Sequence, residues 1–87
     1  MKPRPDIVAR RVESELVLVD LGTNRIYSLN ATGARLWELL NEGRTRAQIV
    51  DALSEEFDAG EADVAAEVDS LLASLESESL VAADADR

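Results

Sequence analysis

The chain has 87 residues, enough for one small domain with a modest hydrophobic core. It contains no cysteine and no histidine, which excludes a disulfide framework, a thiolate metal site and a nucleophile activated by histidine. The net charge is −9 at pH 7, and residues 51–87 carry twelve acidic residues against Arg87 alone. Such a surface repels the phosphate backbone of nucleic acids and attracts cationic partners.

The N-terminal segment Met1–Asp6 carries charges and two prolines and is not followed by an apolar run, so we expect no signal peptide. Pro3 and Pro5 predict an extended or disordered arm. Ile7–Val12 is the predicted first strand. No apolar run is long enough to span a membrane. We therefore expect a cytoplasmic protein.

A β-hairpin follows the first strand. Leu16–Leu21 is predicted to be a strand, and the short loop Gly22–Asn24 connects it to a second strand, Arg25–Leu29. Both faces of the earlier strand are apolar, with Val17, Val19 and Leu21 on one and Leu16 and Leu18 on the other. This pattern predicts an inner strand covered on both faces. The later strand is more polar, and we expect it at the edge of the sheet, with Tyr27 half-buried.

Two amphipathic helices come next. Asn30 is placed to cap a helix over Ala31–Asn41, which Gly43 terminates. Thr45 and Gln48 have the spacing of a capping box and predict the start of a second helix. The expected core residues are Leu36, Trp37, Leu39 and Leu40 of the first helix, and Ile49, Ala52, Leu53 and Phe57 of the second.

A third helix is predicted after the break at Asp58–Gly60, with Glu61 at its positive end. Its apolar residues are spaced i, i+4, i+7, i+8 and i+11: Val64, Val68, Leu71, Leu72 and Leu75. Leu80 and Val81 form a last apolar pair before an Ala/Asp tail that we expect to fray. The whole chain, residues 1–87, therefore reads as one domain with flexible termini and an ordered core over about residues 7–82.

Nothing in the sequence indicates catalysis. Carboxylate pairs such as Glu55 and Glu56 are typical of solvated helix faces, and Asp58, Glu61 and Asp63 lack the spacing of a calcium-binding loop. We expect no catalytic residue, no metal site and no cofactor. The absence of such groups directs attention to the hairpin and helices as a binding surface.

The hairpin and the first two helices carry a family resemblance. The string Tyr27-Ser28-Leu29-Asn30-x-Thr32-Gly33, followed by Leu36-Trp37-Glu38-Leu39-Leu40 and Gly43-x-Thr45, resembles the pyrroloquinoline quinone biosynthesis chaperone family. The third helix is similar as well, in Glu67-Val68-x-x-Leu71-Leu72-x-x-Leu75 ahead of Leu80-Val81. These proteins are stand-alone recognition elements for precursors of ribosomally made, modified peptides. Two positions depart from the family pattern, Ser79 in place of glycine and Glu67 in place of aspartate.

The resemblance implies an α+β, winged-helix-like fold in which a three-stranded antiparallel sheet packs on three helices. The leader segment of a precursor peptide would add as a fourth strand beside Arg25–Leu29, in a groove walled by the third helix. An edge strand has unpaired backbone N–H and C=O groups for such an addition. The implied peptide-binding residues are Arg25, Ile26, Tyr27, Ser28 and Leu29 on the strand, and Val64, Glu67, Val68, Leu71 and Ser74 on the helix.

Within this family we expect a role in lasso-peptide biosynthesis, where a free-standing element hands the leader to a separate leader peptidase. The alternative is the peptide chaperone of pyrroloquinoline quinone assembly, which serves a radical enzyme. The residues alone leave two further possibilities, a winged-helix nucleic-acid-binding regulator and a small regulatory subunit for a folded protein. The predicted third helix is acidic and has no Lys or Arg, which argues against binding to nucleic acid. We expect neither nucleic acid nor a membrane among the partners.

Overall fold

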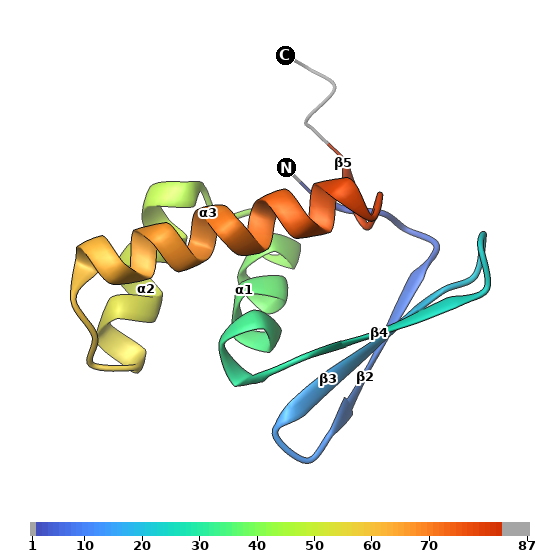
Figure 1. The fold of residues 1–87 in the computed structure, drawn as a ribbon, viewed down its shortest axis with the longest axis horizontal. Helices are drawn as coiled ribbons and strands as arrows, with labels where there is room; N and C mark the ends of the chain where they lie inside the picture. Colours follow the sequence, from blue (N-terminus) through green and yellow to red (C-terminus); the bar gives the residue numbers. More distant parts are fainter. Residues whose placement is uncertain (1, 83–87) are drawn as a thin grey trace.

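The computed structural model describes residues 2–82 and contains the predicted hairpin and helices (Figure 1). A three-stranded sheet precedes three helices, and two short strands near the ends of the chain pair with each other. The elements are β1 (Lys2–Pro3), β2 (Ile7–Val12), β3 (Glu15–Asp20), β4 (Arg25–Leu29), α1 (Ala31–Asn41), α2 (Arg46–Glu56), α3 (Glu61–Ser77) and β5 (Val81–Ala82). The prediction that the Ala/Asp tail frays concerns residues 83–87, which lie outside the described residues.

The sheet has the strand order β2-β3-β4, with both pairs antiparallel. The predicted positions of β3 at the centre and β4 at an edge are confirmed. Leu18 of β3 lies between Ala9 of β2 and Tyr27 of β4, and it is completely buried against the helices. Tyr27 is half-buried, as expected.

The prediction that both faces of β3 are covered is wrong. The hydrophobic core contains Leu16 and Leu18 together with residues of all three helices, and the helices lie on that side of the sheet alone (Figure 1). On the other face Val17 and Val19 are only half-buried, and Leu21, just beyond the strand, is 63% exposed. Apolar residues on both faces of a strand show that either face can be buried. They do not show whether the rest of the chain covers one face or both.

The loop between β3 and β4 is fixed by Asp20. Its carboxylate accepts hydrogen bonds from the backbone N–H groups of Gly22 (2.9 Å) and Thr23 (3.3 Å), and Asn24 takes a left-handed φ of 65°. Desolvation alone would raise the pKa of Asp20, but these hydrogen bonds and the nearby charge of Arg4 outweigh it and hold that pKa below its usual value. The loop therefore holds the start of β4 in a fixed position.

The helix boundaries follow the predicted caps. Asn30 accepts a hydrogen bond from the N–H of Gly33 (2.9 Å). Both hydrogen bonds of the capping box formed by Thr45 and Gln48 are present. Gly43, which follows the C-cap residue Glu42 of α1, has a φ of +83°, a conformation that glycine adopts without steric cost. Trp37 is buried in the core, as expected.

Phe57 departs from its predicted place in the buried stripe of α2. Ile49 and Leu53 of that stripe are buried, but α2 ends at Glu56 and Phe57 is 43% exposed. Asp58 then takes a left-handed φ of 51°, which turns the chain away from the helix axis. Local helical periodicity cannot anticipate that turn, because it assumes that the helix continues.

The two ends of the described chain lie side by side (Figure 1). Strand β1 pairs with β5 through Lys2 with Ala82 and Pro3 with Val81, so the N-terminal arm is extended here. The guanidinium of Arg4 donates a hydrogen bond to the carbonyl of Ser79 (3.1 Å). Ser79 has a φ of 61°, which explains why glycine is usual at this position in the resembled family. This contact secures the segment that follows α3.

Side-chain ion pairs join α1 to α2 and to the sheet. Arg35 of α1 donates to Glu56 of α2 (2.8 and 3.0 Å) and to Glu38 (3.1 Å), while Arg11 of β2 reaches Glu38 from the sheet. Desolvation alone would raise the pKa of Glu38, but the two arginines outweigh it and lower that pKa.

No helix among residues 2–82 combines the length and the apolarity needed to cross a bilayer.

Candidate functional site

Strand β4 pairs with β3 along one side and has no strand partner along the other within residues 2–82. Helix α3 runs along that side of the molecule (Figure 1). The hydroxyl of Tyr27 donates a hydrogen bond to Glu78, just after α3, across 3.1 Å, and a guanidinium nitrogen of Arg25 lies 3.7 Å from the same carboxylate oxygen. The start of β4 and the end of α3 are therefore joined by side chains.

The side chains of β4 alternate between two environments. Tyr27 and Leu29 point toward the helices and are half-buried. Ile26 is 70% exposed on the opposite face, where Ser28 donates a hydrogen bond to Glu15 (3.0 Å). The backbone of these four residues lies at the sheet edge, but of the four only Tyr27 and Leu29 have their side chains on the side of α3.

Three of the predicted peptide-binding residues of α3, Glu67, Leu71 and Ser74, continue to Glu78 in one stripe with the helical spacing i, i+4, i+7 and i+11. Glu78 contacts β4, which places this stripe on the side of that strand. Leu71 is half-buried, and Glu67 and Ser74 are exposed.

Two predicted wall residues of α3 lie deeper than that stripe. Val64 is buried but lines a pocket, while Val68 is fully covered by protein. Val68 can therefore support a wall from behind but cannot touch a ligand in this structure.

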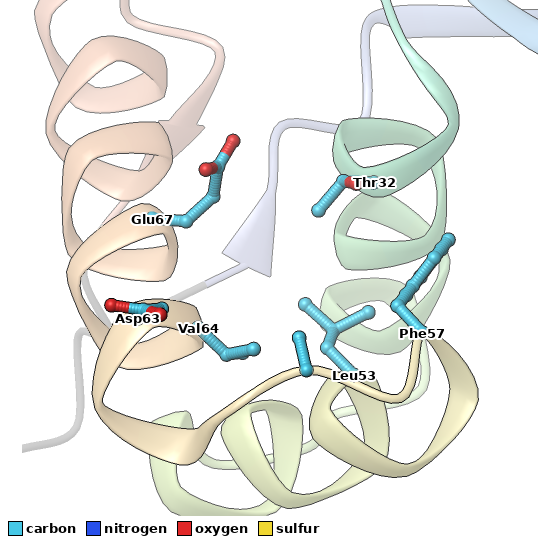
Figure 2. A pocket seen from close by; sticks show the side chains of 7 residues that line it. Thr32, Leu53, Phe57, Asp63, Val64 and Glu67 are labelled. Carbon is cyan, nitrogen blue, oxygen red and sulfur yellow. The ribbon is translucent and has the colours of Figure 1, made fainter.

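A pocket of about 150 Å³ opens where α1, α2 and α3 meet (Figure 2). We call it the apolar pocket; Thr32, Leu53, Phe57, Ala59, Asp63, Val64 and Glu67 line it. Leu53 and Val64 point into its centre, while Glu67 points into the space between α3 and Thr32 of α1 (Figure 2). Of these residues, sequence reasoning proposed only Val64 and Glu67 for the site. For Phe57 the available signal was an aromatic residue directly before the helix break at Asp58.

A second, polar pocket lies at the other end of β4, lined by Thr23, Arg25, Tyr27, Ser77, Glu78 and Ser79. Its charges are already paired, because Arg25 faces Glu78 across it. Sequence reasoning placed Arg25 and Tyr27 in the site but missed Glu78, which lies beyond the predicted apolar stripe.

The acidic residues of α3 differ in their pairing. Arg46 of α2 holds Asp69 through two hydrogen bonds of 2.6 and 2.9 Å, which lower the pKa of that carboxyl. Among the described residues, no arginine lies within ion-pair distance of Asp63 or Glu67. The apolar pocket thus carries unneutralised negative charge at its rim.

The comparisons with known proteins agree with this architecture. The family model for coenzyme PQQ synthesis protein D (PqqD) matches residues 15–81, which include β3, β4, the three helices and the residues that line both pockets. None of the curated proteins is similar enough in sequence to count as a match.

Two solved structures are similar to the whole chain. TbiB1 in complex with the TbiA(beta) leader peptide is 32% identical, covers 99% of this chain and 100% of its own, and superposes with a TM-score of 0.89. A lasso peptide synthetase B1 complexed with the leader peptide is 25% identical, covers 95% of this chain and 96% of its own, and has a TM-score of 0.82. With the family match spanning most of the sequence, the chain belongs to the PqqD family.

Proposed function

We propose that this protein binds the leader segment of a ribosomally made precursor peptide in lasso-peptide biosynthesis. The observation that carries the proposal is the edge of β4 beside α3, which has no strand partner among residues 2–82, in a chain similar over 99% of its length to a protein solved with a leader peptide. An extended peptide beside β4 would pair its backbone with the free edge, and its alternate side chains would face α3. The protein would itself have no catalytic role.

The proposed contacts fall into three groups. Arg25, Ile26, Tyr27, Ser28 and Leu29 would contribute their backbone edge, and Tyr27 and Leu29 also their side chains. Val64, Glu67, Leu71 and Ser74 of α3 would form the facing wall. Val68 would support this wall from the core, because it is fully covered.

The outer face of the sheet suggests where an enzyme could receive the bound leader. Six apolar residues lie on or beside this face, Val8, Val12, Val17, Val19, Leu21 and Ile26, and we call them the outer face. Val8, Val19 and Ile26 stand opposite one another and form a row across all three strands, while Val8 and Val12 are 49% and 50% exposed. Arg10 lies on the same face between Val8 and Val12, and Glu15 lies opposite Val12, so the apolar residues are concentrated in this row. Exposed apolar surface of this kind often marks a protein–protein interface.

We infer that the outer face docks a separate leader peptidase. The face ends at β4, the strand that would carry the leader, so an enzyme seated there would lie next to the peptide it cleaves. Both similar structures come from complexes with leader peptides, and one is called a lasso peptide synthetase. Precursor peptides are made by ribosomes, so we place this encounter in the cytoplasm.

The chaperone role in pyrroloquinoline quinone assembly is the second candidate, because the family model bears that name. It would use the same β4 edge and would differ only in the enzyme that receives the peptide. A nucleic-acid-binding role is disfavoured by the surface of α3, where Glu67 is exposed and has no ion-pair partner among residues 2–82, so that its charge would approach phosphates directly.

The test uses the synthetic leader of the precursor peptide encoded beside this protein and the peptidase encoded with it. We expect one-to-one binding by isothermal titration calorimetry, and faster leader cleavage when the protein is added to the peptidase. Cleavage that proceeds equally fast without the protein would contradict the handover to a peptidase. Absence of any binding would contradict leader recognition itself.

A further inference from the structure

We propose that the apolar pocket receives one basic side chain, Lys or Arg, of the leader peptide. This inference rests on the proposed function and names a specific residue class for one part of that site. The aliphatic stem would lie against Leu53, Phe57 and Val64, and the cationic head would reach Glu67 at the rim. Lys and Arg commonly bury their methylene stems in this way while the charged end stays near water.

The size of the pocket limits it to one side chain. A cavity of about 150 Å³ in another protein accommodates one benzene molecule, so a volume of about 150 Å³ here suits a single long side chain and not two. The floor is apolar, and the polar groups lie at its edge, with Glu67 pointing into the gap toward Thr32 (Figure 2). An apolar floor with a carboxylate at the mouth fits a cationic side chain better than a neutral one.

Charge distribution supports the same occupant. The acids Asp69 and Glu78 are paired with Arg46 and Arg25, whereas Glu67 and Asp63 have no arginine within ion-pair distance in the described part of the chain. Phe57, with 43% of its surface exposed, also lines this pocket. Aromatic faces attract ammonium and guanidinium groups. The carboxylate of Asp63 points away from the pocket, whereas that of Glu67 points into the gap beside it (Figure 2). The Glu67 carboxylate, which has no arginine partner among residues 2–82, and the exposed ring of Phe57 therefore favour a cation.

The position of the pocket fixes where the basic residue lies in the leader. Thr32 follows the last residue of β4, Leu29, by three positions, so the pocket adjoins that end of the strand. At the other end of β4 the carboxylate of Glu78 already has Arg25 as its partner. The basic residue is therefore expected at only one end of the leader segment that pairs with β4, which would also set the direction and register of the peptide.

The experiment is a double-mutant cycle measured by calorimetry at low salt with the synthetic leader of the neighbouring precursor. On the protein side, Glu67→Gln removes the charge, and Glu76→Gln is the matched control, an exposed acid on α3 that lines neither pocket. On the peptide side, each Lys or Arg is replaced in turn by norleucine, which keeps the stem and removes the charge. Thermal melts of each variant verify the fold.

We expect Glu67→Gln to weaken leader binding by about three- to tenfold, whereas Glu76→Gln changes it by less than about twofold. One basic position of the leader should lose its own effect in the Glu67→Gln background, because its partner charge is already absent. Phe57→Leu should weaken the wild-type leader more than the norleucine peptide at that position.

The inference is overturned if Glu67→Gln behaves like Glu76→Gln, if no basic leader position couples to Glu67, or if the leader has no basic residue. In each of these cases a leader that still binds, and loses binding when β4 is disrupted, leaves the proposed function intact. A leader that does not bind the wild-type protein at all overturns both.

Discussion

The edge of β4 and the outer face of the sheet are both uncovered in the described part of the chain, and they suit different partners. The edge of β4 presents backbone N–H and C=O groups beside an acidic helix, which suits an extended peptide. The outer face presents apolar side chains, such as Ile26 at 70% exposure, which suit the shape-matched surface of a folded protein. Because the two surfaces meet along β4, they could be occupied together by a leader and by the enzyme that processes it. Each can be disabled separately.

Proline substitution in β4 is expected to give the largest effect, because proline removes a backbone donor from the strand. The direction of N–H groups alternates along a strand, so only one of Tyr27→Pro and Ser28→Pro removes a donor at the free edge. That variant should weaken leader binding by about tenfold or more, whereas alanine at the same position has a smaller effect. The other variant should mainly lower the melting temperature, since its N–H faces β3.

The matched controls are Ala9→Pro and Arg10→Pro in β2, the opposite edge of the same sheet. Whichever of them remains folded should bind the leader with unchanged affinity. If both β4 variants fold and bind the leader normally, the peptide does not add to this strand.

Specificity along the edge is expected to come from one or two leader residues. Backbone pairing cannot distinguish one sequence from another, so bulky or ring-shaped leader residues (Tyr, Pro, Leu or Phe) should fill the space between β4 and α3. Burial of each would stabilise the complex by about 1.5–3 kcal/mol, and alanine there should lower affinity by about tenfold or more. An alanine scan of the leader measured by calorimetry checks this. A scan in which every position stays below about 1 kcal/mol would mean that no pocket selects the peptide.

Ile26→Glu separates the two surfaces most directly. A charge placed on the outer face should oppose docking of the peptidase, because the carboxylate would be desolvated there. We expect leader affinity to stay within about twofold and leader cleavage to slow by about tenfold. Ser14→Glu, with the same added charge in the exposed turn between β2 and β3, is the control. An equal loss of leader affinity in Ile26→Glu would show that the two surfaces are not independent.

The salt dependence of leader binding is expected to be a smaller effect, and it tests the charges beside the β4 edge. Exposed ion pairs contribute only about 0.2–1 kcal/mol each and are screened by salt, so leader affinity should fall by about two- to fivefold between low and high salt. Glu67→Lys should weaken binding of a basic leader and leave the melting curve nearly unchanged, because Glu67 is exposed and has no ion-pair partner in the described part of the chain. If leader affinity changes neither with salt nor in Glu67→Lys, the proposed electrostatic contribution is wrong, but strand addition to β4 is not contradicted.

Much of the fold could be predicted because its signals are local. The asparagine cap of α1, the capping box of α2 and the apolar stripe of α3 each depend on neighbours within one or two helical turns. The polar character of β4 likewise predicted its place at an edge. Of the residues expected in the binding site, those of β4 and the exposed stripe of α3 lie on facing elements, while Val68 lies in the core.

Local patterns in the sequence predicted the order and type of the main elements and the capped starts of the first two helices, because caps, turns and periodicity act over a few residues. They missed the end of α2 at Glu56. The tertiary structure alone decided which face of β3 the helices cover, how the arm at Pro3 pairs with Val81, and that Phe57 is exposed at a pocket. It also brought Glu78 to Tyr27, 51 residues apart in the chain, and left Glu67 without a partner among the described residues. Such features depend on the relative placement of whole elements, which packing of the shared core fixes and no local pattern encodes.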